Sequence, residues 1–218
     1  MEKRYEITEK QLAFLDNFID KKYSSINEET RIELIDHLIS DFEVTTENGN
    51  LSQYLSNELE FIRGFVGARI NLIQKNYNRE VRLKYLSFFT KIKLLPLTIL
   101  GFILIYVLVS KLNNNLLWLS FFFSVFGIYG YSLLITTFKS KKIRKLEEIK
   151  LLGTGFGMGI PYLMVIFPLL IEDKKFLYDN TLFFTSYWFF ALSLSIASIL
   201  VLKEKKKIIL EKYKHLLN

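Results

Sequence analysis

The sequence predicts an all-α protein, in which a small N-terminal cytoplasmic helical bundle is followed by a four-helix transmembrane domain. Three observations indicate this fold class: four long uncharged runs in the second half, helical spacing of apolar residues in the first half, and an uneven division of charge. Residues 1–91 contain 13 Lys and Arg against 15 Asp and Glu, whereas residues 92–218 contain 16 against 7. Two domains that face different solvents explain this division.

Residues 1–77 have the pattern of a helical bundle. Thr8-Glu-Lys-Gln11 fits a capping box, and apolar residues then recur at helical spacing to about Tyr23, at Leu12, Leu15 and Ile19. A second capping-box pattern, Ser25-Ile-Asn-Glu28, predicts the start of another helix, which ends before Glu47-Asn-Gly-Asn50. The expected buried stripe of this second helix, with Leu38 beside it, is Ile32, Ile35, Ile39 and Phe42.

A third and long helix is expected from Leu51 onward. Its apolar residues keep roughly one face, at Leu55, Leu59, Ile62, Val66, Ile70, Ile73 and Tyr77. Gly64 and Gly67 interrupt this pattern, and each costs about 1 kcal/mol relative to Ala inside a helix. They indicate either close packing or a break near Arg63-Gly64. Three amphipathic helices that face each other would form the bundle.

Residues 78–93 have a different pattern, because aromatic and aliphatic residues interleave with basic ones, at Arg79, Arg82, Lys84 and Lys91. We expect a basic amphipathic helix at the membrane surface, with anionic lipid head groups as its partners. A cytosolic linker helix is the alternative interpretation.

The transmembrane domain is expected at residues 94–202. Four runs contain no Asp, Glu, Lys, Arg or His, and they cover residues 94–110, 116–138, 151–171 and 181–202. A hydrocarbon core about 30 Å thick needs roughly 20 helical residues, and runs of this length in lipid form helices because the backbone must satisfy its own hydrogen bonds.

Lys and Arg collect on one side of these spans. The segment Lys139–Lys150 has six basic residues, and the tail at residues 203–218 opens with Lys203-Glu-Lys-Lys-Lys207. Basic loops remain in the cytoplasm, so both of these segments and the N-terminus are predicted to be cytoplasmic. We expect a multi-pass protein of the cytoplasmic (inner) membrane.

Four glycines in the third run form two overlapping small-xxx-small pairs, Gly153 with Gly157 and Gly155 with Gly159. Such pairs let helix backbones approach closely in a membrane. A phosphate-binding loop is the other interpretation, but Ile160 stands where a dinucleotide-binding fingerprint needs glycine, and no Walker lysine follows. These glycines are therefore predicted to be helix-packing residues.

The second helix carries Glu33, His37 and Asp41 four residues apart, with Asp36 close by. A divalent metal could use such side chains, but ligands on one exposed straight helix do not surround an ion. A solvated helix face requires polar side chains in any case. We expect these four residues to form an interaction surface and not a metal site.

No catalytic or cofactor constellation stands out. The chain has no cysteine, which excludes thiolate chemistry, and the four runs lack the ionisable residues on which ion pathways and intramembrane hydrolysis depend. We expect no enzymatic activity, no cofactor and no metal.

The segment Glu33-Leu-Ile-Asp-His-Leu-Ile-Ser-Asp-Phe-Glu43, flanked by two further helices, resembles the acidic and leucine-rich second helix of HAAS-type domains in bacterial membrane proteins. The resemblance covers about residues 8–76 and departs from the family where a Leu-Gly-x-Pro-like turn is replaced by Arg63-Gly-Phe65. It implies a signalling or regulatory module, sometimes associated with PadR-like transcription regulators, and it transfers no catalytic residue.

Two functions are expected on these grounds. The first is a non-enzymatic regulatory or signalling membrane protein, whose cytoplasmic bundle binds a protein partner such as a transcription regulator. The alternative is the membrane subunit of a transporter or exporter. No nucleic-acid partner is expected, and the oligomeric state is left open.

Overall fold

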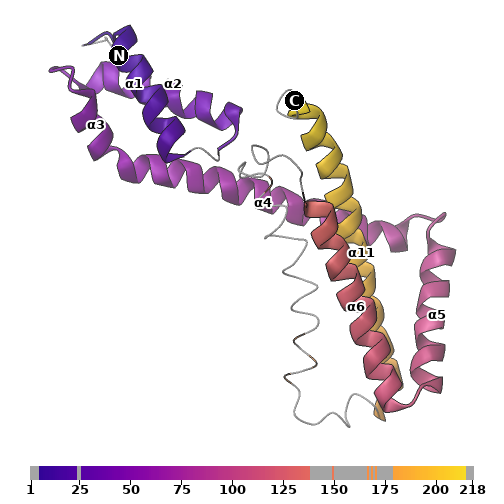
Figure 1. Cartoon of the computed structure of the whole chain (residues 1–218). Helices are drawn as coiled ribbons and strands as arrows, with labels where there is room; N and C mark the ends of the chain where they lie inside the picture. The colour runs from indigo at the N-terminus through magenta and orange to yellow at the C-terminus, as the bar shows by residue number, and fades with distance from the viewer. Residues whose placement is uncertain are drawn as a thin grey trace. The chain divides into compact units, whose positions relative to one another are not determined.

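The computed structural model describes residues 5–23, 26–137 and 179–214, together with the single positions 149, 166, 168 and 170. All regular structure in these residues is helical, which confirms the all-α prediction. The helices are α1 (Glu9–Lys22), α2 (Glu28–Thr45), α3 (Leu51–Asn57), α4 (Leu59–Thr90), α5 (Leu95–Lys111), α6 (Asn114–Thr136) and α11 (Thr181–Lys212) (Figure 1).

The chain divides into two compact units, and the division falls inside α4. The N-terminal unit ends at Gln74, and Lys75 begins the second unit. Residues 5–74 contain 6 Lys and Arg against 13 Asp and Glu, so the described part of the N-terminal unit is strongly acidic.

The helix starts follow the side chains that cap them. Thr8 forms the predicted capping box with Gln11 at the start of α1. The predicted box at Ser25 is wrong, because α2 begins at Glu28 and its N-cap is Asn27, whose side-chain oxygen accepts a hydrogen bond from the Thr30 amide at 2.8 Å. An asparagine side chain caps an N-terminus at least as well as serine, so the helix begins later than the box implied.

The core of the N-terminal unit is aliphatic with one central aromatic ring. Its fully buried side chains include Leu15, Ile19, Leu34, Leu38, Phe42, Leu55 and Ile62. The predicted stripe of α2 is wrong at its first member, because Ile32 is 55% exposed whereas Leu34 is completely buried. Ile35 and Ile39 are only partly buried and lie at the edge of the core.

The expected long third helix is two helices. The chain breaks at Glu58 between α3 and α4, and Leu55 of α3 and Ile62 of α4 are both buried in the same core. α4 runs through Gly64 and Gly67 without interruption, and in the described part of the chain a Cβ atom added at either glycine would meet no atom within 4 Å beyond its adjacent residues and the backbone of the same helix. The predicted break at Arg63-Gly64 is therefore wrong, and the glycines are not explained by close packing.

Two helices are long and apolar enough to cross a bilayer, namely α6 and α11. α4 and α5 together make a third candidate, with a bend of 90° between them. The described residues thus contain two or three candidate spans and not four. The predicted span at residues 151–171, with Gly153, Gly155, Gly157 and Gly159, lies outside the described residues.

α11 is the central helix of the second unit and packs against both α5 and α6 (Figure 1). An aromatic cluster joins α6 to α11, in which the rings of Phe121 and Trp188 lie 5.9 Å apart and the Trp188 indole donates a hydrogen bond to the Ser124 hydroxyl at 3.0 Å. α11 is buried along most of its length, from Phe184 to Ile209, and between Ala191 and Leu202 only Ile196 is exposed.

α11 remains helical beyond its apolar run, through the basic residues that were predicted as a tail, as far as Lys212. Lys205 forms an ion pair of 2.6 Å with Glu80 of α4, and Glu204 forms one of 2.5 Å with Lys84. The Lys206 amine donates to the carbonyl oxygen of Ile135 at 2.6 Å, at the end of α6. Side chains of α11 therefore hold the ends of two other helices in this unit.

Candidate protein-interaction site

Two hollows lie along the polar surface of α2, and both belong to the N-terminal unit. The first, named here the α2 hollow, has a volume of about 510 Å³ and is lined by Glu29, Ile32, Glu33, Asp36, His37 and Ser40. Three of the four predicted interaction residues lie in it. The fourth, Asp41, lines the second hollow instead.

Each predicted residue of the α2 hollow has its own surroundings. Glu33 forms an ion pair with Arg69 of α4, and the His37 ring packs edge-on against Phe65 at a centroid distance of 5.8 Å. Asp36 is exposed. The side chains do not converge on one point, and no group of three or more His, Asp or Glu residues in the described part of the chain could hold a metal ion.

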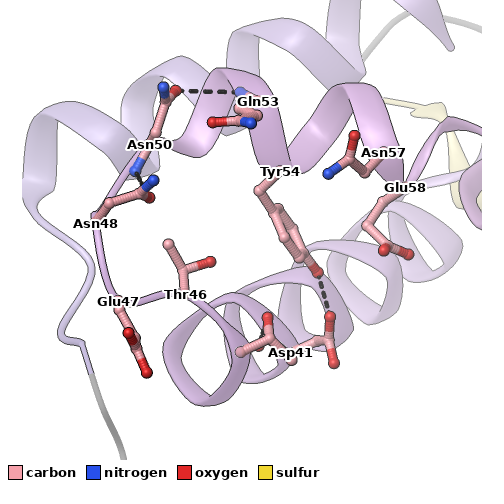
Figure 2. A pocket seen from close by; sticks show the side chains of 10 residues that line it. Asp41, Thr46, Glu47, Asn48, Asn50, Gln53, Tyr54, Asn57 and Glu58 are labelled. Carbon is pink, nitrogen blue, oxygen red and sulfur yellow. Dashed lines mark hydrogen bonds between the residues drawn. The ribbon is translucent and has the colours of Figure 1, made fainter.

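The second hollow, named here the C-terminal hollow, lies where α2 ends and α3 begins (Figure 2). It has a volume of about 520 Å³ and is lined by Asp41, Thr45, Thr46, Glu47, Asn48, Asn50, Gln53, Tyr54, Asn57 and Glu58. Three of these side chains are carboxylates, and none of them is Lys or Arg. Its surface is therefore acidic and rich in hydrogen-bonding groups.

Tyr54 and Asp41 form the wall of the C-terminal hollow, as Figure 2 shows. The Tyr54 hydroxyl donates a hydrogen bond to the Asp41 carboxylate at 2.8 Å, and its ring packs edge-on against Phe42 at 5.2 Å. Burial and then this hydrogen bond raise the pKa of Tyr54 above its usual value, because both disfavour a phenolate beside a carboxylate. Tyr54 is therefore a neutral donor at physiological pH.

The rim of the C-terminal hollow is a turn that the rest of the unit holds in place. The Asn48 side chain accepts from the Asn50 amide at 3.0 Å, and Asn50 in turn caps α3 by accepting from the Gln53 amide at 3.1 Å. Gly49 has a φ of 65°, and its carbonyl accepts from the Gln11 side chain of α1 at 2.8 Å. The shape of the hollow is thus formed before any ligand binds.

Glu43 supports this arrangement and was not among the predicted residues. It is only 5% exposed, and its side chain accepts a hydrogen bond from the Ile7 amide at 3.2 Å. Its own carbonyl accepts from the Tyr5 amide at 3.1 Å, so Glu43 fastens the segment before α1 to α2. The sequence does contain a sign that Glu43 is buried. Glu43 lies four residues after Ile39, so this carboxylate falls on the helix face that was expected to be apolar.

The geometry supports recognition through charge, hydrogen bonds and one exposed apolar side chain. Comparisons of the chain with family models, with curated proteins and with solved structures find no match.

Proposed function

We propose that the chain is a non-enzymatic regulatory or signalling protein of the cytoplasmic membrane, and that its N-terminal unit binds a cytoplasmic protein. The observation that carries this proposal is the C-terminal hollow. It is a preformed, acidic and solvent-accessible site on a unit that already closes its own core. A unit with a complete core does not need this surface for folding, so the surface is available for a partner.

The chemistry of the hollow identifies the kind of partner. Asp41, Glu47 and Glu58 supply negative charge, and Gln53 and Asn57 supply hydrogen-bonding amides. A segment of a partner protein that carries Lys or Arg side chains complements both features. A cytoplasmic transcription regulator is one example of such a partner.

Photo-crosslinking in cells tests the proposal. A benzophenone amino acid at Gln53 on the rim of the hollow is expected to give a discrete adduct, and the same label at Lys21, which is exposed near the C-terminal end of α1 and does not line the hollow, is expected to give none. Reversing the charges of Glu47 and Glu58 to Lys should weaken the adduct at least tenfold. Equal adducts at both labelled positions, or an adduct that survives charge reversal, would refute the site.

The proposal includes four spans with both termini in the cytoplasm. Because the chain has no cysteine, single cysteines at Asn113, Ser140 and Asp179 report topology with a membrane-impermeant thiol reagent. Positions 113 and 179 should react in intact cells and position 140 should not. Reaction at position 140 alone would invert the topology.

The alternative, a membrane subunit of a transporter, has less support. Two serine hydroxyls of α11 bond to their own helix, since that of Ser193 donates to the Phe189 carbonyl at 2.7 Å and that of Ser195 to the Ala191 carbonyl at 2.6 Å. Both hydroxyl protons are therefore satisfied within the helix, without a transported ion. Specific cation flux into liposomes that contain the purified protein would favour the transporter.

A further inference from the structure

The C-terminal part of α4, which belongs to the second unit, has a buried side and an exposed side. Tyr77 and Val81 are buried, and the Tyr85 ring packs edge-on against Phe190 of α11 at a centroid distance of 5.6 Å. The exposed side chains recur three or four residues apart and therefore share one side of the helix. They form a surface, named here the outer α4 face, that consists of Arg79, Arg82, Leu83, Leu86 and Phe89.

The outer α4 face carries positive charge. Residues 75–93 contain six basic residues and a single acidic one, Glu80. Glu80 is engaged by Lys205 of α11 at 2.6 Å, so its charge is neutralised on the other side of the helix. Arg79 and Arg82 are exposed and form no ion pair with any residue that the structure describes. Two guanidinium groups therefore remain available to an anion.

The structure separates the basic residues that the sequence pattern placed together. Lys84 is only half-exposed, and its amine contacts the Glu204 carboxylate of α11 at 2.5 Å. It is thus part of the protein's own packing and does not contribute to the outer α4 face. Arg79 and Arg82 keep the property that suits them to phosphate, because a guanidinium can donate two parallel hydrogen bonds to one phosphate group.

The direction of α4 is the second observation. α5 begins after only four intervening residues, and the two helices are bent by 90° relative to each other (Figure 1). α5 packs against α11, which is long and apolar enough to cross a bilayer. When α5 stands in a bilayer beside α11, the helix perpendicular to it runs along the bilayer surface.

The order of side chains along the outer α4 face fits this direction. Leu83, Leu86 and Phe89 lie in about the last two turns before the bend, and they are 55%, 46% and 40% exposed. Arg79 and Arg82 precede them. Apolar side chains of a surface helix enter the boundary between head groups and acyl chains, while its basic side chains stay among the phosphates.

We propose that the outer α4 face is a binding site for anionic phospholipids, in which Arg79 and Arg82 bind the lipid phosphates and the three apolar side chains enter the bilayer. Anionic lipids are preferred over zwitterionic ones because each basic residue near an anionic surface raises the affinity about fivefold. This inference does not depend on the cytoplasmic partner, whose site is the C-terminal hollow. It rests on the proposed position of α5, α6 and α11 in a bilayer, which the experiment below tests separately.

Quenching by brominated lipids tests the proposal on the full-length protein. Because the chain has no cysteine, Thr90→Cys, which is exposed at the end of α4, can carry a single fluorescent label. The protein is reconstituted in mixtures of phosphatidylcholine and phosphatidylglycerol, and one lipid at a time is brominated on its acyl chains. Only a label inside the bilayer is quenched, and titration of the brominated lipid gives the relative binding constant of the two lipids at that label. Leu119→Cys, exposed near the start of α6, is the reference position.

The label at Thr90 should report a preference for phosphatidylglycerol of roughly 25-fold, since two arginines contribute about fivefold each. The label at Leu119 should report nearly equal binding of the two lipids. Arg79→Gln together with Arg82→Gln should remove the preference at Thr90, and the corresponding pair of lysine substitutions should retain most of it. Retention by the lysine pair, with unchanged quenching at Leu119, separates loss of charge from loss of fold.

A matched control removes the same net charge elsewhere in the chain. Lys21→Gln together with Lys22→Gln changes two exposed residues of α1 and should leave the preference at Thr90 unchanged. An equal loss of preference in this control would show that only the net charge of the chain matters, and would overturn the site.

Three further results would overturn the proposal. Quenching at Leu119 but not at Thr90 would mean that the end of α4 lies outside the bilayer, as a cytosolic linker does. Equal binding of the two lipids at Thr90, or a preference that survives removal of both arginines, would mean that the outer α4 face does not select anionic lipids. Absence of quenching at Leu119 would refute the membrane position of α6 itself, and this inference with it.

Discussion

Replacement of Gly49 by alanine should destabilise the N-terminal unit through two separable effects. The first is conformational, because Gly49 has a φ of 65° and an L-residue in this left-handed region costs about 1–2 kcal/mol. The second is steric. An alanine Cβ would lie 2.6 Å from two carbon atoms of the Tyr5 ring and 2.7 Å from its oxygen, so the ring must move.

The steric effect has a magnitude that follows from the contacts of Tyr5. Its ring packs edge-on against Phe42 at 5.4 Å, and such an aromatic pair contributes about 0.5–1.5 kcal/mol. Its hydroxyl accepts from the Gln11 side chain at 3.2 Å, and a hydrogen bond of this kind contributes about 1 kcal/mol. Loss of both contacts together with the conformational term gives a total of about 2.5–4.5 kcal/mol.

A double-mutant cycle tests this account. In a Tyr5→Ala background the steric effect is absent, so Gly49→Ala should cost only about 1–2 kcal/mol. Hydrogen exchange of the α2 amides in the full-length protein, read by mass spectrometry, reports the opening free energy of the unit. An equal cost of Gly49→Ala in both backgrounds would refute the clash with Tyr5, and a cost below about 0.5 kcal/mol would also refute the conformational term.

Three further predictions concern the core, the alkaline limit and the second unit. Leu34→Ala should cost about 2–5 kcal/mol by hydrogen exchange, whereas Ile32→Ala should cost almost nothing; similar costs would mean that the faces of α2 are reversed. Because the pKa of Tyr54 is raised in the folded protein, Tyr54 stabilises the fold fully below about pH 10, the ordinary tyrosine pKa. This stabilisation is lost as the pH rises above that value. Helix content should therefore fall in alkaline solution, and Tyr54→Phe should make the fall shallower; an unchanged profile contradicts this. Glu80→Lys should lower the melting temperature of the purified protein, and additional Lys205→Glu should recover part of the loss. No recovery in the double variant would mean that the 2.6 Å ion pair contributes nothing to stability.

The sequence predicted the start of α1 because a capping box is a local feature. Thr8 and Gln11 bond to each other and to adjacent backbone, so no tertiary contact is needed to define the helix start. The stripe of α2 was less predictable. Ile32 and Leu34 are both aliphatic, and the choice between them depends on which sides of α2 the neighbouring helices cover.

Only one of the four predicted interaction residues, Asp41, lines the hollow that is proposed as the partner site. Glu33, Asp36, His37 and Asp41 do lie on the outer side of α2, as a polar helix face implies. Their separation into two hollows results from partners far along the chain, Tyr54 for Asp41 and Arg69 for Glu33. Spacing within one helix carries no information about such partners.

The break at Glu58 could not be predicted for a similar reason. The apolar spacing continues across it, so the periodicity on either side is compatible with one long helix. Gly64 and Gly67, near which the break was predicted, have no neighbours among the described residues that require glycine. Residues of both α3 and α4 are buried in one shared core.

The burial of α11 has a consequence for how this helix can vary in length. Twelve of its residues are buried, from Phe184 to Ile209, and small side chains occupy the middle of this set at Ala191, Ser195 and Ser198. Insertion of one residue would turn everything that follows by about 100° and carry Lys206 away from the carbonyl of Ile135. An insertion of seven residues would restore the direction but move the amine about 10 Å along the axis. The number of residues in α11 therefore sets the distance from the aromatic cluster to the end of α6. Natural variants of this protein should replace residues along this helix far more readily than they insert or delete them.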